Sequence, residues 1–375
     1  MATTTTSPIW ADAAAPLELP PLAGEAWAHT CVVGLGGSGL TAVLELRARG
    51  KTVVGIDAGT VGGAAAGRNG GFLLAGLHSF HHDVVRDHGR AAADEAYRLT
   101  LAELEKTVTE TPEAVRRTGS LRIAADAAEL ADCRAHLAAL QASGFPGEWY
   151  TGAEGEGLLI PTDAVFQPLV RCRQLARRAL ALDARLHEHT QAIGISGDGV
   201  MTSRGTIRCE RVIVAVDGKL EVIFPELSRR IRTARLQMLA TAPERAVRFP
   251  RPVYYRWGFE YWQQLADGRV ALGGFRDQGG EGEWTTDTTP TEAVQQRLEA
   301  FLREHLQVQA PVTHRWAASV GYSADGLPLV EEVRPGVWVC GGYSGTGNLV
   351  GPLAARTAVA LALGQRTPLA DLLGC

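Results

Sequence analysis

The segment from Cys31 to Ala58 limits what this chain can fold into more than any other part of the sequence. The apolar run TCVVGLG, which starts at Thr30, predicts a buried parallel strand. SGLTAVLELRARG predicts an amphipathic helix that ends at Gly50, and TVVGID predicts a second strand directly afterwards. Strand, glycine turn, helix and strand within about thirty residues form the βαβ unit of a doubly wound sheet.

The turn of this unit carries the pattern G-x-G-x-x-G. Gly34 permits the tight turn, Gly36 lets backbone amides approach a pyrophosphate, and Gly39 lets helix and strand pack closely. The positive end of the helix dipole favours the same anion. Asp57, at the end of the second strand, is placed to accept hydrogen bonds from ribose hydroxyls and repels a 2′-phosphate. The pattern therefore predicts a dinucleotide site, but leaves FAD and NAD both open.

A second glycine-rich loop lies near the C-terminus, in WVCGGYSGTGN. Gly341, Gly342, Gly345 and Gly347 precede an Ala- and Leu-rich helix, so their amides can form another anion cradle. Such a cradle would stabilise negative charge that arrives on an isoalloxazine ring, at O2 or N1, when the ring accepts a hydride. Four glycines in seven residues make a plain strand-to-helix turn the poorer interpretation.

Composition excludes several other classes of protein. A net charge of −4 provides no field that would attract nucleic acid or an anionic membrane. The six cysteines form no C-x-x-C pair, so neither a zinc site nor a disulfide framework is expected, and reduced thiols suit the cytoplasm. The first thirty residues show neither the basic region nor the apolar run of a secretion signal, so none is expected, and no apolar run reaches the ~20 residues that span a bilayer. We expect a cytoplasmic protein without metal, nucleic acid or membrane partners, and leave a homo-oligomer open.

Four further stretches occur in a specific order. They are VGGAAAGRNGGFLLAG from Val61; DAVFQPLVRCRQLARRAL followed by TQAIGI; RVIVAVDG ending at Gly218; and GYSADGLPLV followed by WVCGGYSGTGNLVGPLAARTAVALALG. In this order they resemble the D-amino-acid oxidase (DAO) family of FAD-dependent oxidoreductases, and most nearly its glutamylputrescine oxidase-like branch. The resemblance covers residues 30–370 and favours non-covalently bound FAD as the dinucleotide.

The resemblance implies an α/β fold with an FAD-binding, Rossmann-like doubly wound sheet. A second α+β substrate domain, made of antiparallel sheet plus helices, is inserted into it. We expect residues 1–27 to form an N-terminal arm that Trp10 and Trp27 pin to the body. The FAD-binding domain is predicted to comprise 28–83, 162–224 and 312–375, and the substrate domain 84–161 and 225–311.

The resemblance also implies which residues contact FAD. The loop after the second strand wraps the flavin, the backbone near Ile193 meets adenine, and the strand that ends at Gly218 closes the cleft. From the residues alone, Arg68 and Asn69 are equally consistent with ordinary loop positions. The complete expected set is Gly34, Gly36, Gly37, Ser38, Gly39, Asp57, Ala58, Arg68, Asn69, Gly70, Gly71, Ile193, Asp217, Gly218, Gly342, Ser344, Gly345, Thr346, Gly347 and Asn348.

Three positions depart from relatives of the sarcosine oxidase type. Ala318 stands where those relatives attach flavin through a Cys, so no covalent link is expected there. Ala271 stands where they carry a Lys that activates oxygen, and Thr346 where a His is common. The resemblance therefore implies a flavin oxidoreductase more firmly than an oxidase.

Aromatic residues mark the expected substrate site. VYYRWGFEYW supplies Tyr255 and Arg256, and a later strand supplies Tyr322. Arg256 would pair with a substrate carboxylate, and the tyrosines would line the cavity, although core or subunit-interface positions explain such aromatics equally well. These three are our catalytic candidates.

The predicted reaction is oxidation of the C–N bond of an amine or amino acid by hydride transfer to FAD. The electrons then pass to oxygen or another acceptor. Two alternatives stay open: a flavin dehydrogenase acting on another C–H donor, and a flavin-binding protein whose catalysis has decayed.

Overall fold

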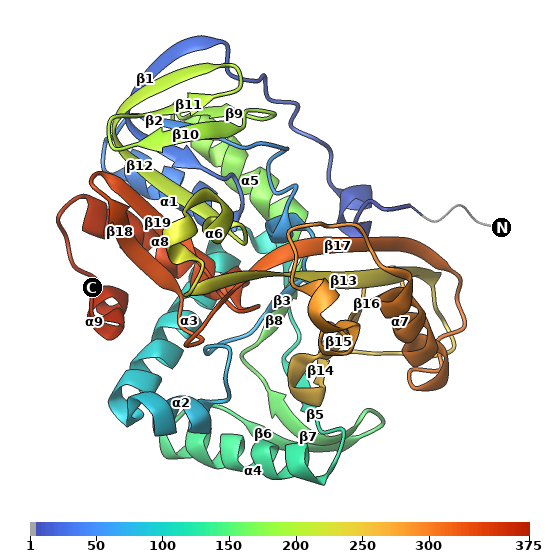
Figure 1. The fold of residues 1–375 in the computed structure, drawn as a ribbon. Coiled ribbons are helices and arrows are strands. Elements are labelled where there is room, and N and C mark those ends of the chain that lie inside the picture. The colour runs from blue at the N-terminus through green and yellow to red at the C-terminus, as the bar shows by residue number, and fades with distance from the viewer. Residues whose placement is uncertain (1–4) are drawn as a thin grey trace.

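The computed structural model describes residues 5–375 and contains two eight-stranded sheets and one three-stranded sheet (Figure 1). The first sheet has the order β10-β11-β12-β1-β2-β9, with β19 also paired to β12 and β18 to β19. Its strands are β1 (Gly24–Val33), β2 (Val53–Ile56), β9 (Arg185–His187), β10 (Ala192–Ser196), β11 (Gly199–Thr202), β12 (Gly205–Asp217), β18 (Leu329–Arg334) and β19 (Val337–Gly341).

Parallel pairing dominates the centre of this sheet. β1 pairs in parallel with β2 and β12, β12 with β19, and β2 with β9. Helices α1 (Gly37–Ala48), α5 (Pro168–Ala181) and α8 (Gly347–Ala362) pack together over one face, where Val32, Val43 and Ala355 belong to one buried cluster. The predicted strand–turn–helix–strand unit and the α/β fold class are confirmed.

The second sheet is mostly antiparallel, with the order β17-β13-β16-β15-β14-β5-β7-β6. Its long strands β13 and β17 run side by side from the first sheet towards α7 (Figure 1). Its strands are β5 (Ser120–Ile123), β6 (Glu148–Gly152), β7 (Gly155–Ile160), β13 (Ile231–Pro243), β14 (Val253–Tyr255), β15 (Glu260–Gln264), β16 (Arg269–Gly274) and β17 (Val312–Ser323). The helix α7 spans Glu292–Glu304. β17, which starts the C-terminal segment assigned to the FAD-binding domain, pairs here with β13. The domain boundaries themselves stay a prediction.

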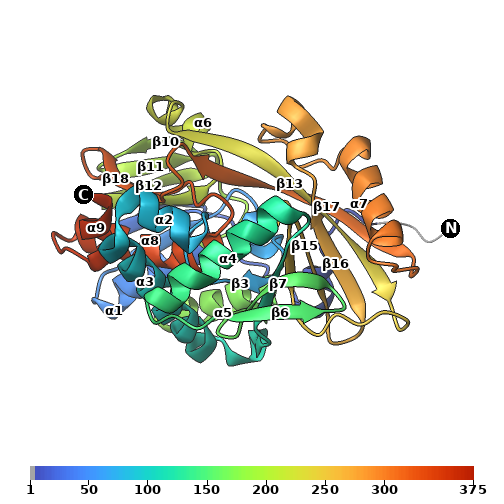
Figure 2. The same ribbon diagram turned by 90° about the horizontal axis from the view of Figure 1, so that it is seen from below.

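A helical layer lies beside both sheets. Figure 2 shows α2, α3 and α4 on the near side of the molecule when it is viewed from below. The layer comprises α2 (His81–His88), α3 (Arg90–Glu110) and α4 (Ala127–Ala142), and the small sheet comprises β3 (Phe72–Leu73), β8 (Ala164–Phe166) and β4 (Val115–Arg117). No helix within residues 5–375 is both long enough and apolar enough to cross a membrane.

The N-terminal arm is held by one of its two tryptophans. Trp10 is buried, and its indole Nε1 donates a hydrogen bond to the carbonyl of Asn69 at 2.8 Å. Trp27 lies in β1 and is 58% exposed, so the expectation that it pins the arm is wrong. The first residues of the predicted arm, 1–4, lie outside the described part of the chain.

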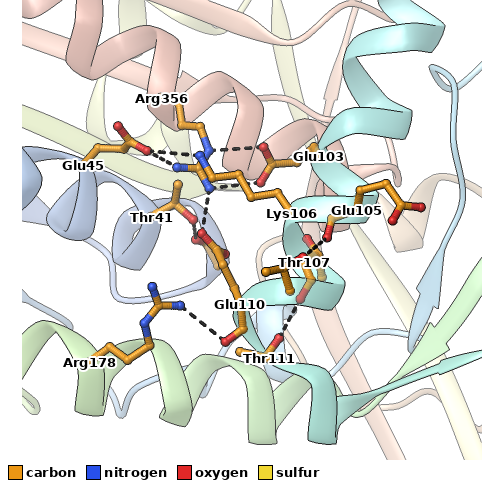
Figure 3. Close-up of polar contacts among 12 residues, drawn as sticks. Thr41, Glu45, Glu103, Glu105, Lys106, Thr107, Glu110, Thr111, Arg178 and Arg356 are labelled. Carbon is orange, nitrogen blue, oxygen red and sulfur yellow. Dashed lines mark hydrogen bonds and ion pairs between the residues drawn. The ribbon is translucent and has the colours of Figure 1, made fainter.

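A buried ionic network fastens α3 to the helices of the first sheet (Figure 3). Arg356 of α8 pairs with Glu103 and Glu110 of α3, both at 3.1 Å, and with Glu45 of α1. Burial raises the pKa of Glu103, and the guanidinium of Arg356 opposes that shift. Arg356 is thus the cation that pairs with the buried Glu103, whereas Glu45 also pairs with Arg49 and Lys106, and Glu110 with Arg171.

Replacing Arg356 by methionine should be strongly destabilising. Arg356→Met keeps most of the apolar stem but leaves the buried Glu103 without its ion-pair partner, while Glu45 keeps Arg49 and Lys106, and Glu110 keeps Arg171. We expect the free energy of unfolding at neutral pH to fall by about 3–5 kcal/mol. Urea unfolding followed by circular dichroism measures this change.

Arg98→Met is the matched control, because Arg98 also contacts carboxylates of α3 but its side chain is 56% exposed. Loss of a surface pair costs about 0–1 kcal/mol. Equal effects of the two substitutions would show that the network contributes no more than surface pairs do.

Candidate active site

A cavity of about 850 Å³ lies between the first sheet and the second. On one side it is lined by the turns that follow β1, β2, β12 and β19, which are the carboxyl ends of parallel strands. Ligands of open α/β sheets bind at this edge. On the other side it is lined by β13, β15 and β17 of the second sheet. The cavity therefore brings the predicted cofactor turns against the predicted substrate sheet.

The first glycine turn can be made only by glycine. Gly34 has φ +98°, and a Cβ there would lie 2.6 Å from the carbonyl oxygen of Ala215. A Cβ on Gly39 would lie 1.8 Å from the carbonyl oxygen of Gly34. Gly39 thus packs behind the turn, whereas Gly37 and Ser38 line the cavity at the N-terminus of α1. The cavity wall at this point presents backbone rather than side chains.

Asp57 lies at the end of β2, facing the cavity together with Ala58. One carboxylate oxygen accepts the amide hydrogen of Leu35 and the other that of Gly59, both at 2.8 Å. Burial is the largest influence on this carboxyl and raises its pKa. Asp57 therefore orders the turn that carries the glycine pattern, in addition to facing the cavity as predicted.

Glu188 is a buried acid that the sequence reasoning missed. Its carboxylate accepts the amides of Val61 at 2.7 Å and Leu19 at 2.9 Å, so it joins the flavin loop to the N-terminal arm. Nearby, Gln191 and Ala192 line the cavity, whereas Ile193 is 61% exposed and does not. Pattern alone does not fix a strand to within one residue, which explains the offset.

Two asparagines join the flavin loop to the C-terminal loop. Asn69 accepts the amide of Gly71 at 2.9 Å, and Asn348 donates to Asn69 at 3.2 Å and to the carbonyl of Phe72 at 2.8 Å. Arg68 donates through Nε to the carbonyl of Ala317 at 2.8 Å. Its guanidinium has no carboxylate partner within residues 5–375, so its charge remains available to a ligand. Arg68, Asn69, Gly70 and Asn348 line the cavity, and Gly71 lies behind it.

Asp217 is the buried centre of the C-terminal side. It lies at the end of β12, and its carboxyl accepts the amides of Tyr343 at 3.1 Å and Gly321 at 3.3 Å. The amide of Gly342 also stabilises its charge, but burial dominates and raises the pKa of Asp217 to about 6. Around it the cavity is lined by Asp217, Gly218, Ser344, Gly345, Thr346 and Gly347, whereas Gly342 is not in the lining.

The structure places one of the three catalytic candidates in the cavity lining and the other two outside it. Tyr322 lines the cavity, together with Tyr254 and Tyr261, which the prediction had not singled out. Tyr255 points to the opposite face of the sheet, where its ring packs on Phe301.

Arg256 is bound to Glu260 at 2.7 Å and Asp277 at 2.9 Å, and it is absent from the cavity lining. The placement of Tyr255 and Arg256 at a substrate therefore needs correction. Residues alternate between the faces of a strand, so Tyr254, not Tyr255, faces the cavity.

The three positions at which the sequence departs from relatives of the sarcosine oxidase type have different surroundings. Ala318 and Thr346 line the cavity. Ala271 is instead buried in an apolar cluster with Trp10, Met238 and Trp316. No group of His, Cys, Asp and Glu suited to hold a metal ion occurs within the described residues 5–375.

Comparison with known proteins gives consistent matches over nearly the whole chain. The family model DAO, described as FAD dependent oxidoreductase, matches residues 29–361. A probable oxidoreductase OrdL of Rhizobium meliloti is 27% identical, over 94% of this chain and 87% of that protein. The gamma-glutamylputrescine oxidoreductase of Escherichia coli is 24% identical, over 89% of this chain and 83% of that protein. Glycine oxidase from Geobacillus kaustophilus has a similar structure, with a TM-score of 0.76 at 21% identity over 92% of this chain and 98% of that one.

The raised pKa of Asp217 predicts a specific pH dependence of stability. Between the ordinary value of 3.8 and about 6, the folded protein binds this proton more tightly than the unfolded chain does. The contribution of this proton to the free energy of unfolding is therefore fully present below pH 3.8 and is lost as the pH rises through about 6. Asp217→Asn cannot titrate and should remove this dependence.

We expect the stability of the wild type relative to Asp217→Asn to increase by up to about 3 kcal/mol as the pH falls from 7 to 4. Urea unfolding midpoints of both proteins across that range measure the change. Asp325→Asn, on an exposed loop, is the control. A difference between wild type and Asp217→Asn that stays constant with pH would refute the assignment.

Proposed function

Because this chain belongs to the DAO family of FAD-dependent oxidoreductases, we propose that it oxidises the C–N bond of an amine or amino acid. The product would be an imine that hydrolyses. The observation that carries the proposal is the cavity in which the dinucleotide turns meet an aromatic wall. The printed names of its relatives, which include a gamma-glutamylputrescine oxidoreductase and a glycine oxidase, support the same substrate class.

FAD is the cofactor, and the residues present fit it. A Cβ on Gly37 would meet nothing within 4 Å, so the N-terminus of α1 is open to a pyrophosphate, and Asp57 faces the place of a ribose. The loop from Gly345 to Asn348 would hold the flavin end. When bound, FAD supplies a ring that accepts a hydride. Ala318 offers no atom for a covalent link.

The chain's own residues would exclude water and hold the amine. Tyr254, Tyr261 and Phe72 form a packed aromatic group, with ring centroids 5.6 to 5.9 Å apart. Burial raises the pKa of Tyr254 to about 12, so its hydroxyl stays protonated at neutral pH. Such a wall orients an uncharged amine without competing for its proton.

His78 is a polar residue of the cavity that would accept a hydrogen bond from the amine. It lines the cavity, and its ring meets that of Tyr322 edge-on with centroids 6.3 Å apart. Burial, together with the charge of Arg276, lowers the pKa of His78, so the imidazole is neutral at pH 7. A neutral imidazole can accept a hydrogen bond from the amine at its ring nitrogen.

The resemblance implies that Ala271 stands where oxygen-activating relatives have a lysine, and this supports an electron acceptor other than oxygen. A dehydrogenase that acts on an amine is therefore the second candidate. All six cysteines are free, which supports a reducing, cytoplasmic setting. Assembly into a homo-oligomer remains a prediction.

Cofactor retention should depend on Gly39. A methyl group there would collide with the carbonyl of Gly34, so Gly39→Ala must move α1 away from β1. We expect purified Gly39→Ala to carry less than about a tenth of the wild-type FAD, measured as the flavin-to-protein absorbance ratio. Gly282→Ala, where a Cβ meets nothing within 4 Å, is the control and should retain FAD fully.

Anaerobic mixing with a panel of amines and amino acids tests the reaction. We expect at least one amine to bleach the flavin absorbance, and Tyr322→Phe to slow that bleaching by about tenfold because it loses a hydroxyl in the cavity. Tyr255→Phe, on the opposite face of the sheet, should reduce flavin at the wild-type rate. Absence of bleaching with every amine would contradict the proposal. Bleaching that air does not reverse would exclude only an oxidase.

A further inference from the structure

Two buried tryptophans from opposite ends of the chain hold the backbone of the flavin loop from behind. We infer that Trp10 of the arm and Trp316 of β17 are positioning residues, which aim two backbone amides of this loop at the flavin ring. They act through the loop and touch neither the cofactor nor the substrate. The inference rests on the proposed placement of the flavin at this loop, and it explains how the arm can affect the chemistry of the cofactor.

The two indoles bind neighbouring carbonyl groups. Nε1 of Trp316 donates to the carbonyl of Arg68 at 2.8 Å, and Nε1 of Trp10 donates to the carbonyl of Asn69, also at 2.8 Å. Trp10 is 2% exposed and Trp316 is fully buried. Neither belongs to the cavity lining, whereas Arg68 and Asn69 both do. The two carbonyls therefore point away from the cavity, into the protein.

The next residue of the loop continues this arrangement. Gln263 of β15 donates through Nε2 to the carbonyl of Gly70 at 2.6 Å and to that of Gly71 at 3.2 Å. Gln263 is buried and also lies outside the cavity lining. Donors on three separate segments thus turn successive carbonyls of the loop to the same side.

The amides of the same peptide groups point the other way. In a trans peptide the carbonyl and the amide hydrogen lie on opposite sides of the bond. The amide of Asn69 shares its peptide group with the carbonyl of Arg68, and the amide of Gly70 shares its group with the carbonyl of Asn69. Neither amide has an acceptor among residues 5–375, whereas the following amide, that of Gly71, is taken up by the Asn69 side chain at 2.9 Å. Two donors therefore remain for a ligand in the cavity.

The place of these amides favours the flavin ring as that ligand. A Cβ on Gly70 would lie 3.0 Å from the ring of Tyr261, so the loop lies against the aromatic wall. Asn348 of the C-terminal loop donates to Asn69 at 3.2 Å, so the same residues also adjoin the proposed flavin end. A flavin ring gains negative charge with a hydride, and amide hydrogens that are fixed in advance stabilise that charge.

Each indole is hard to replace as a donor. Trp10 and Trp316 belong to one apolar cluster, together with Met238 and Ala240, whose side chains carry no N–H or O–H group. A loop carbonyl that loses its indole would therefore be left unpaired in apolar surroundings, which is costly. We expect its peptide group to rotate towards another donor and to turn the linked amide away from the flavin.

The competing explanation is that the two rings only fill the core, and the reduction potential of bound FAD distinguishes the two. Trp10→Phe and Trp316→Phe each keep an aromatic ring and lose the N–H donor. The potential is measured on the FAD-loaded protein at pH 7 by equilibration with a reference dye. In each variant we expect the ratio of reduced to oxidised flavin at a fixed dye ratio to fall about fivefold, or about 20 mV for a two-electron couple.

Trp262→Phe is the matched control. Trp262 is 2% exposed and lies outside the cavity lining, and its Nε1 has no partner within residues 5–375. This substitution makes the same change of volume in the core without removing a hydrogen bond, so it should leave the potential at the wild-type value. Urea unfolding of the three FAD-loaded variants reports the packing cost of each substitution separately.

Potentials of Trp10→Phe and Trp316→Phe that equal that of Trp262→Phe would overturn the inference, whatever their stabilities. If Trp10→Phe does not fold, Trp316→Phe provides the same test, because Trp316 lies in β17 and not in the arm. Dye equilibration uses a chemical reductant and no amine. A lowered potential in a protein whose flavin no amine bleaches would therefore support the inference and contradict the proposed oxidation alone.

Discussion

The carboxyl group of Asp217 holds together the three chain segments on which the cavity depends. It lies at the end of β12 and accepts amide hydrogens from Tyr343, after β19, and from Gly321, in β17. β12 and β19 belong to the first sheet and β17 to the second. One buried acid therefore fixes the turn of the flavin end against the strand that forms the opposite wall. Its raised pKa is the energetic consequence of burying that acid among amides rather than cations.

The cavity changes its chemical character along its length. At the cofactor turns it presents backbone amides, together with the guanidinium of Arg68, which has no carboxylate partner within residues 5–375 and suits a dinucleotide. The middle of the cavity is formed by tyrosine rings whose hydroxyl groups remain protonated. The helical layer contributes Tyr97 and His136 to the lining. Arg356 and its three carboxylates anchor α3 of that layer to the first sheet, so a network remote from the chemistry sets the position of this wall.

The N-terminal arm contributes to the interior as well as to the surface. Trp10 is buried in the same apolar cluster as Ala271, and its indole nitrogen donates to the flavin loop at Asn69. A segment whose sequence shows no secondary-structure periodicity thus becomes part of the core.

The sequence by itself determined the βαβ unit and the α/β fold class, and its resemblance to the DAO family identified FAD as the cofactor. The unit could be found because the steric requirement at Gly39, whose Cβ would meet the carbonyl oxygen of Gly34, acts between residues close in the chain and leaves a local pattern. Tertiary structure alone decided that Tyr254 rather than Tyr255 faces the cavity, that Arg256 is bound to Glu260 and Asp277, and that Trp10 and Trp316 bind successive carbonyls of the flavin loop. Which face of a strand points inward, and which distant carboxylate neutralises an arginine, depend on the register between segments far apart in the chain, and no local pattern records that register.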